Sequence, residues 1–302
     1  MNAGVCAWEG HNLFTYCVGL PSTPELAGGR SDSRSTSNNM EKLFIVGLIL
    51  HGCVADHYTT KPDFIKTCLK SDPNFDDCSK ESVQGLFNAL GPGLPEINLP
   101  PIDPLNIPKI RILQGEGPVN VNAALENVVV TGFGKTEVIS SQVDSKNYAF
   151  FTRVRVPKMR IEGTYDLKGR ILLIPLVGNG LCWFEPSNMS IDIISDVKLY
   201  EKDGFSFFNV TKVHVKYNIG GMKLHMSNLF DGISSLEDGT NAYLNSNWRP
   251  VSESLRPILS KTIEDILLDF MQQIFHNLPA NFMIEDLKTH FTNNKKPRKG
   301  SD

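Results

Sequence analysis

The chain has 302 residues, of which 41% are hydrophobic and 21% charged, which is enough apolar material for one long globular domain or two. Its formal net charge is -3 at pH 7. Binding to nucleic acid requires clustered basic side chains that neutralise phosphates, so this charge balance disfavours a nucleic-acid partner.

The two ends of the chain differ in composition from the rest. Residues 1–39 include a stretch rich in Gly, Ser, Thr, Pro and Asn without periodic apolar positions, which predicts a disordered extension. Residues 292–302 are basic and lack apolar partners, which predicts a solvated, disordered tail, with a membrane or nucleic-acid contact as the alternative.

Residues 40–55 have the three parts of a secretory signal peptide. Met40 and Lys42 precede the apolar run 43–50, and a cleavage site follows at Ala55. The run is shorter than the about 20 residues that span a bilayer, so we expect no stable membrane insertion. Because a signal peptide acts from the N-terminus, we expect translation to start at Met40. The alternative is that the run forms a buried strand or helical turn. The prediction is a secreted, extracellular protein with a single domain over residues 56–291.

Loss of the first 55 residues would leave three cysteines, Cys68, Cys78 and Cys182. A polar, turn-rich loop separates the first two, which could close a disulfide in an oxidising compartment. Two unrelated thiols or half of a metal site are the alternatives. Cys182 lies in an apolar stretch, which predicts a buried free thiol and not a nucleophile. The sequons at Asn188 and Asn209 are those of a secreted glycoprotein.

The first predicted element is a short amphipathic helix from its N-cap Ser79 to Leu90. Prolines crowd residues 92–108, which predicts an extended strap. From residue 109 to 226 apolar and polar positions alternate, as in an antiparallel sheet with one dry face. The clearest apolar sets are Val119, Val121, Ala123 and Leu125, then Thr152, Val154 and Val156, and then Val213, Val215, Tyr217 and Ile219.

Interruptions of this pattern predict where the strands end. The apolar set changes parity after Pro157, which indicates a bulge or strand break. Glycine-containing turns at 168–170, 203–204 and 220–221 predict consecutive hairpins.

The dry face needs a cover, and residues 252–276 predict one. Leu255, Leu259, Thr262, Ile266 and Phe270 recur at the spacing of one helical face, with Pro257 near the first turn. The predicted fold class is α+β, with this long helix held in the concave face of a strongly curved antiparallel sheet. Such a sheet around one helix encloses more volume than side chains easily fill, so we expect an apolar tunnel.

The sequence contains no G-x-S-x-G, H-E-x-x-H, Walker or dinucleotide-binding motif, and we predict neither an enzyme nor a bound cofactor. A hairpin at residues 220–221 would place His214 near His225. Two ordinary surface histidines are a better interpretation than a metal site, because Lys216 and Lys223 would oppose a cation.

The segment from Asn228 to Trp248 reads NLFDGISSLEDGTNAYLNSNW, and residues 101–105 read PIDPL. Both resemble motifs of the insect takeout and juvenile-hormone-binding protein family. The matching positions are Asp103, Pro104, Asn228, Phe230, Gly232, Asn245 and Trp248. We expect these residues to fix loops and not to contact a ligand, because turn and cap chemistry explains them.

The resemblance implies the α-wrap fold of that family, an N-terminal disulfide between Cys68 and Cys78, and a tunnel for a juvenile-hormone-like terpenoid, a fatty acid or a similar lipid. Juvenile-hormone binders of the family carry a second disulfide. Only Cys182 remains here to form one, so the takeout-like branch fits better.

The predicted function is a monomeric carrier of a small hydrophobic ligand. Tyr165, Tyr217 and Thr262 are the candidates for polar groups that set specificity. The full set of candidate ligand-binding residues is Phe133, Phe150, Tyr165, Trp183, Phe207, Tyr217, Leu259, Thr262, Ile266 and Phe270.

Two other functions stay open on the sequence. One is an interaction protein that binds no lipid and engages a cell-surface receptor through residues 228–248. The other is a secreted hydrolase with a serine near His214, His225 or His276.

Overall fold

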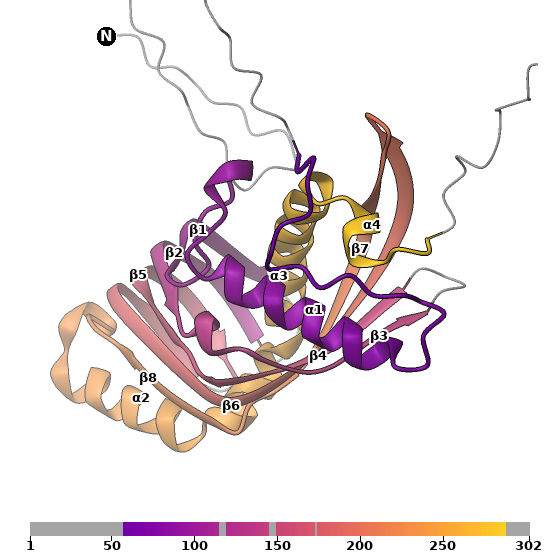
Figure 1. Cartoon of the computed structure of the whole chain (residues 1–302). Helices are drawn as coiled ribbons and strands as arrows, with labels where there is room; N and C mark the ends of the chain where they lie inside the picture. Colours follow the sequence, from indigo (N-terminus) through magenta and orange to yellow (C-terminus); the bar gives the residue numbers. More distant parts are fainter. Residues whose placement is uncertain (1–56, 115–118, 145–148, 173, 288–302) are drawn as a thin grey trace, which may run out of the picture. The chain divides into compact units, whose positions relative to one another are not determined.

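The computed structural model describes residues 57–114, 119–144, 149–172 and 174–287. The predicted extension, signal peptide and basic tail lie outside these residues. The described part contains an eight-stranded antiparallel sheet and a long C-terminal helix (Figure 1).

The strands are β1 (Leu105–Gln114), β2 (Val119–Thr131), β3 (Glu137–Asp144), β4 (Ala149–Lys158), β5 (Arg160–Ile171), β6 (Ile174–Lys202), β7 (Phe205–Asn218) and β8 (Gly221–Met226). The helices are α1 (Phe75–Leu90), α2 (Ser234–Ser246), α3 (Trp248–Asn277) and α4 (Ala280–Met283), with the short turns η1 (Pro95–Ile97), η2 (Phe133–Lys135) and η3 (Phe230–Gly232).

The 29-residue strand β6 organises the sheet. Along one of its edges, β5 pairs with the first half of β6 and β4 with the second half. Along the other edge, β8 pairs near the middle of β6 and β7 with the second half. The sheet extends from β5 to β2 and β1, and from β4 to β3. Two half-sheets therefore share one long strand. Among the described residues β1 and β3 do not pair with each other, so the sheet is not closed.

The strands on both edges of β6 are interrupted at the same level along it, between β4 and β5 on one edge and between β7 and β8 on the other. Met159 lies between β4 and β5, and its N–H donates to the carbonyl oxygen of Pro186 at 3.0 Å. On the opposite edge, the N–H of Gly220 donates to the carbonyl oxygens of Ser187 and Asn188 at 3.0 and 3.2 Å. Asn188 itself has a left-handed φ of 50°. The strand break predicted after Pro157 is confirmed, and the interruption extends across the sheet.

Two predicted turns have opposite outcomes. The turn at Asp203–Gly204 is confirmed, because both residues have positive φ, 51° and 84°, between β6 and β7. The turn predicted at 168–170 is wrong, since Gly169 pairs with Val121 of β2 and with Leu176 of β6. A Cβ at Gly169 would lie 2.2 Å from the carbonyl oxygen of Asn120. Gly169 therefore allows β5 to approach β2 more closely than a residue with a side chain would.

The hairpin predicted at Gly220–Gly221 is also wrong. The chain bends there, and β8 continues along β6 from where β7 ends. His214 lies opposite Ile194, and His225 lies opposite Trp183, on different halves of β6. The glycines therefore mark a bend between two strands that pair with successive parts of β6.

The N-terminal helix begins earlier than predicted. α1 begins at Phe75, and Asn74 holds the N-cap position. Ser79 is buried inside the helix, where its hydroxyl bonds to the hydroxyl of Ser141 in β3 at 2.9 Å. Ser79 is therefore a packing contact and not a cap. In the strap that follows, Pro108 lies within β1, at the edge of the sheet, where a missing N–H is tolerated.

The long helix is confirmed and extends beyond the predicted bounds in both directions, from Trp248 to Asn277. Pro257 lies inside the helix and not in its first turn. Proline has no N–H, so the helical hydrogen bond to the carbonyl oxygen of Glu253 is missing. The ring of Pro257 is exposed to solvent, and the helix continues past it with the loss of that hydrogen bond.

Polar side chains of α3 bond to the free edge of β7. In the described residues β7 pairs with β6 alone, which leaves outward-facing backbone groups on its other edge. Three side chains of α3, each eight residues after the last, satisfy such groups. Arg256 donates to the oxygen of Tyr217, Glu264 accepts from the N–H of Val215 at 3.0 Å, and Gln272 donates to the oxygen of Val210 at 2.8 Å.

The buried apolar residues form two separate clusters, which we call core A and core B. Core A packs α1, α4 and the end of α3 against β7, and core B packs α2 and the start of α3 against β2, β5, β6 and β8. Core A includes Leu86, Leu90, Phe208, Val213, Val215, Tyr217, Ile274 and Ala280. Core B includes Val119, Val121, Tyr165, Leu176, Cys182, Leu224, Leu244 and Val251.

Candidate ligand-binding site

The middle of α3 connects the two cores and differs from both ends of the helix. Within α3, all of which the structure describes, buried side chains occur only near the two ends, at Val251, Ser252, Ile274 and Phe275. The apolar side chains between them remain half-buried. They are Leu255, Ile258, Leu259, Ile263, Ile266, Leu267, Leu268, Phe270 and Met271. Apolar side chains that stay partly accessible over such a length are candidates for contact with an apolar ligand.

The sheet contributes further half-buried apolar side chains to the same region. Ile191 and Ile193 of β6, Phe150 of β4 and Ile219 pack at the margin of core A. Phe184 of β6 packs at the margin of core B. The candidate site is therefore the half-buried apolar surface that the central part of α3 and the neighbouring side chains of β6 form at the margins of the two cores.

The structure brings several of the predicted ligand residues to this site. Leu259, Thr262, Ile266 and Phe270 are half-buried along α3. Phe150 is also half-buried, and its ring meets the ring of Phe208 edge-on at 5.1 Å. Phe133 is half-buried in η2, at the margin of core A.

Trp183 lies away from the site. Its neighbours in β6, Cys182 and Phe184, face core B, and alternation along the strand places Trp183 on the opposite face. There the Arg160 guanidinium stands 4.4 Å from the centre of its ring, and the ring of His225 lies 6.2 Å away. Apolar composition alone did not reveal which face this side chain takes.

Phe207 is also separate from the site. It is fully buried, but its ring packs with His57 at 5.2 Å, Tyr200 at 5.6 Å and Phe205 at 6.5 Å. Phe208, the next residue of β7, belongs to core A. Phe207 therefore belongs to a packed aromatic group on the other face of β7.

The three candidate polar groups have different environments. Tyr165 donates its hydroxyl proton to the carbonyl oxygen of Ser227 at 2.8 Å, and burial raises the pKa of Tyr165 to about 12. Thr262 donates to the carbonyl oxygen of Ile258 at 3.1 Å, within its own helix. The hydroxyl of Tyr217 is buried and has no hydrogen-bond partner among the described residues.

The family-motif residues have structural roles. The carboxylate of Asp103 accepts from the N–H groups of Gly132 and Gly134 at 3.0 and 2.7 Å. Asn228 donates to the carbonyl oxygen of Asn179 at 2.7 Å. Gly232 has a positive φ of 75°, as a tight turn requires. Phe230 packs at the margin of core B, and Trp248 begins α3 with the Arg249 guanidinium 5.0 Å from its ring.

Residues 233–248 are mainly helical, which the sequence did not predict. Gly239 lies inside α2. Two asparagines of α2 hold this helix against the free edge of β8. Asn245 bonds to both backbone groups of Leu224 at 3.0 and 2.8 Å, and Asn241, which the sequence analysis missed, bonds to both backbone groups of Met226 at 2.9 Å. The two asparagines are four residues apart, a spacing that places both side chains on one face of a helix. This spacing is the signal in the sequence that could have revealed them.

His214 and His225 lie on different halves of the sheet. The Nδ1 of His214 contacts a carboxylate oxygen of Glu264 at 2.7 Å, so this histidine helps to position α3. Within the described ranges no group of three or more His, Cys, Asp or Glu side chains could hold a metal ion. No helix in the described part of the chain is long and apolar enough to cross a membrane.

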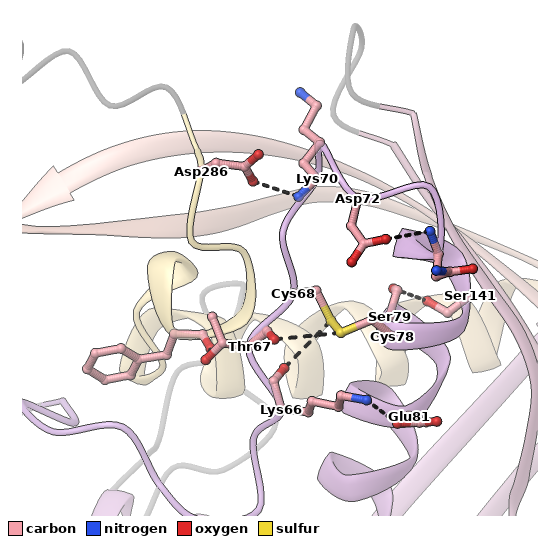
Figure 2. The surroundings of a disulfide bond; sticks show 12 residues. Lys66, Thr67, Cys68, Lys70, Asp72, Cys78, Ser79, Glu81, Ser141 and Asp286 are labelled. Carbon is pink, nitrogen blue, oxygen red and sulfur yellow. Dashed lines mark hydrogen bonds and ion pairs between the residues drawn. A yellow bond between two sulfur atoms is a disulfide. The ribbon is translucent and has the colours of Figure 1, made fainter.

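Cys68 and Cys78 form a disulfide with their Cα atoms 5.7 Å apart. Figure 2 shows that this bond joins the segment around Thr67 to α1, next to the C-terminal segment that carries Asp286. The Asp286 carboxylate accepts from the backbone N–H groups of Lys70 and Ser71 at 2.6 and 3.0 Å. The sequons differ in exposure: Asn188 is exposed and Asn209 is half-buried.

Cys182 is a buried free thiol, and burial raises its pKa to about 11. At pH 8 only about 0.1% of such a thiol is ionised, and the thiolate is the reactive form. Iodoacetamide should therefore label Cys182 at least about tenfold more slowly in the native protein than in urea. Mass spectrometry of the peptide that contains Cys182 measures both rates, and equal rates would show an accessible thiol.

Comparison with known proteins gives a consistent result. The sequence model of the family described as "Haemolymph juvenile hormone binding protein (JHBP)" matches residues 45–285. The circadian clock-controlled protein daywake of Drosophila yakuba is 22% identical over 230 residues, which cover 72% of this chain and 86% of that protein. A putative beta-carotene-binding protein of Schistocerca gregaria is 23% identical over 217 residues, 71% of this chain and 85% of that protein.

The fold also has a solved counterpart. The crystal structure of Epiphyas postvittana Takeout 1 superposes with a TM-score of 0.64 at 19% identity, over 73% of this chain and 99% of that chain. The curved sheet and the long C-terminal helix are thus a known arrangement. The chain belongs to the haemolymph juvenile hormone binding protein family, which includes the takeout proteins.

Proposed function

We propose that the chain is a secreted, monomeric, non-enzymatic carrier that binds a small lipophilic ligand between the central part of α3 and β6. The observation that carries this proposal is the half-buried apolar stripe along the central part of α3, at the margins of the two cores. Contact of these apolar side chains with water costs free energy, and a bound lipid would remove that contact.

The comparisons support the same class of ligand. The matching family model is named for juvenile hormone binding, and the relative from Schistocerca gregaria is named for beta-carotene. Both are apolar molecules. A ligand that buries roughly 400 Å² of apolar surface gains about 10 kcal/mol gross, and association and ordering costs reduce this to micromolar or nanomolar affinity.

Secretion is supported by the disulfide between Cys68 and Cys78, because such bonds persist in oxidising compartments. The exposed Asn188 sequon is available for glycosylation in the same compartment. Edman or mass-spectrometric determination of the N-terminus of the secreted protein tests this part. We expect the chain to begin near Asp56.

The direct test of ligand binding is native mass spectrometry of the secreted protein, followed by extraction of the denatured protein. We expect one chain per particle and a stoichiometric apolar molecule in the extract. A protein that is empty and takes up no terpenoid or fatty acid from a panel would contradict the carrier function.

A substitution locates the site on α3. Ile263→Glu places a charge in the half-buried stripe, so uptake of a lipophilic fluorescent probe should weaken at least about tenfold. Lys261→Glu is the matched control, because Lys261 is exposed and its ion pair with Asp265 lies at the surface. Equal losses in both variants would place the site elsewhere.

One observation favours the alternative of a receptor-binding protein. Ile233, Leu236 and Tyr243 are exposed around α2, within the segment that carries the family motif. Exposed apolar side chains that gather on one element are common in protein interfaces. The empty protein described above would favour this alternative.

A further inference from the structure

The backbone of the turn that precedes α2 is strained. Among the described non-glycine residues with a left-handed φ, most are Asn or Asp, which tolerate this conformation, and the exceptions are Leu172 at 56° and Phe230 at 53°. Asp231 follows Phe230 with a φ of 55°. A bulky residue in this conformation is costly, and proteins keep such residues mainly at ligand clamps and switch regions.

Both bulky strained residues lie at the same end of the sheet. Leu172 lies in the turn between β5 and β6. Phe230 follows Leu229, which forms an isolated bridge with Gly178 near the start of β6. Leu172 and Phe230 are both half-buried and pack against core B. The two costly conformations therefore occur together, beside one core.

Leu229 and Phe230, which we call the plug, belong to the core that borders the candidate site. Leu229 is fully buried in core B, and Phe230 is half-buried at its margin. Leu255 and Ile258 of the apolar stripe of α3 pack against the same core. Residues 231–236, which follow the plug, are all exposed. The plug therefore connects the surface of the protein to the core beside the stripe.

The plug lies between two firmly bonded segments. Before it, Asn228 donates to the carbonyl oxygen of Asn179 in β6 at 2.7 Å. After it, the two asparagines of α2 hold that helix to β8. Between these anchors, the carboxylate of Glu237 accepts from the N–H of Leu229 at 3.2 Å. A strained turn between fixed ends can change conformation while the sheet and α2 stay in place.

We propose that the plug is a gate through which the ligand enters and leaves the candidate site, and that Glu237 holds this gate closed. The strain of the turn lowers the free energy needed to open it. Opening precedes both uptake and release, so a change in opening alters both rates by the same factor and leaves the affinity unchanged. This inference rests on the proposed carrier function and assigns the route of its ligand.

The first pair of variants changes the strain. Asp231→Val puts a β-branched residue at a left-handed φ, which raises the free energy of the closed turn. Uptake and release of the lipophilic probe phenylnaphthylamine, followed by stopped-flow fluorescence, should both become at least about threefold faster, with a dissociation constant within about twofold of the wild type. Asp203→Val is the matched control. Asp203 is also exposed and has a φ of 51°, but it lies between β6 and β7, so this variant should keep the wild-type rates.

The second pair of variants removes the contact that holds the plug. Glu237→Ala leaves the N–H of Leu229 without this acceptor, so both rates should again rise together. Asp238→Ala removes the same charge from the next position of α2, and it should keep the wild-type rates because Asp238 is exposed. This pair carries the test if Asp231→Val does not fold.

The outcomes separate the gate from the carrier function. Rates in Asp231→Val and Glu237→Ala equal to those of their controls would overturn the gate and place the route of the ligand elsewhere. Weaker affinity with an unchanged uptake rate would show that the turn contacts the ligand, which also overturns the gate. Failure of the wild type to bind the probe would overturn the carrier function itself, and the gate with it.

Discussion

Replacing Asn241 by leucine is expected to lower the free energy of unfolding by about 3 kcal/mol. The amide of Asn241 bonds to the N–H and to the carbonyl oxygen of Met226, both at 2.9 Å, in a buried position. Leucine has a similar volume and no polar atoms, so both backbone groups would stay buried without a partner. Urea unfolding followed by circular dichroism measures the change.

The control is Asn247→Ala. The side chain of Asn247 makes one bond, to the carbonyl oxygen of Tyr243, and lies at the surface, so its loss should cost below about 0.5 kcal/mol. If the two variants were equally stable, the contact between α2 and β8 would not hold the fold together, and the asparagines would need another explanation.

The second large effect is expected from the disulfide. Cys68 and Cys78 are separated by 10 residues in sequence, and closing such a loop contributes about 2.7 kcal/mol in the chain-entropy model. The double variant Cys68→Ser and Cys78→Ser should lose about this amount in urea unfolding. Lys66→Met, which removes only the exposed ion pair with Glu81, should lose less than about 1 kcal/mol.

The loss should also spread to the C-terminal segment. Cys68 donates its N–H to the oxygen of Met283 at 2.8 Å and accepts from the N–H of Glu285 at 3.0 Å. Without the disulfide, hydrogen exchange at Glu285 should become faster, while exchange in the centre of β6 stays slow. Unchanged exchange at Glu285 would show that the C-terminal segment is held independently of the disulfide.

The sequence by itself determined the features that depend on local periodicity. The alternation from Val213 to Ile219 placed those side chains on the buried face, and the helical spacing from Leu255 to Phe270 predicted α3. The change of parity at Pro157 marked the end of β4. Each of these signals lies within one segment, where the period of the backbone alone decides which side chains share a face.

Only the tertiary structure decided which strand pairs with which. Glycines at 220–221 predict a hairpin by local chemistry, but β8 gains more by pairing with the free edge of β6. The same long-range pairing places Trp183 beside Arg160, outside the candidate site. Only the structure shows that Ser234–Ser246 form the helix α2.

The hydroxyl groups of the three candidate polar residues also depend on tertiary contacts that the sequence does not reveal. Tyr165, Tyr217 and Thr262 cannot be ranked from sequence, because the partner of a hydroxyl comes from a distant segment or from the preceding helical turn. The fold supplies Ser227 to Tyr165 and Ile258 to Thr262, and among the described residues it supplies no partner to Tyr217. Sequence periodicity thus determined the secondary structure, and the tertiary contacts decided which hydroxyl has a hydrogen-bond partner in the fold.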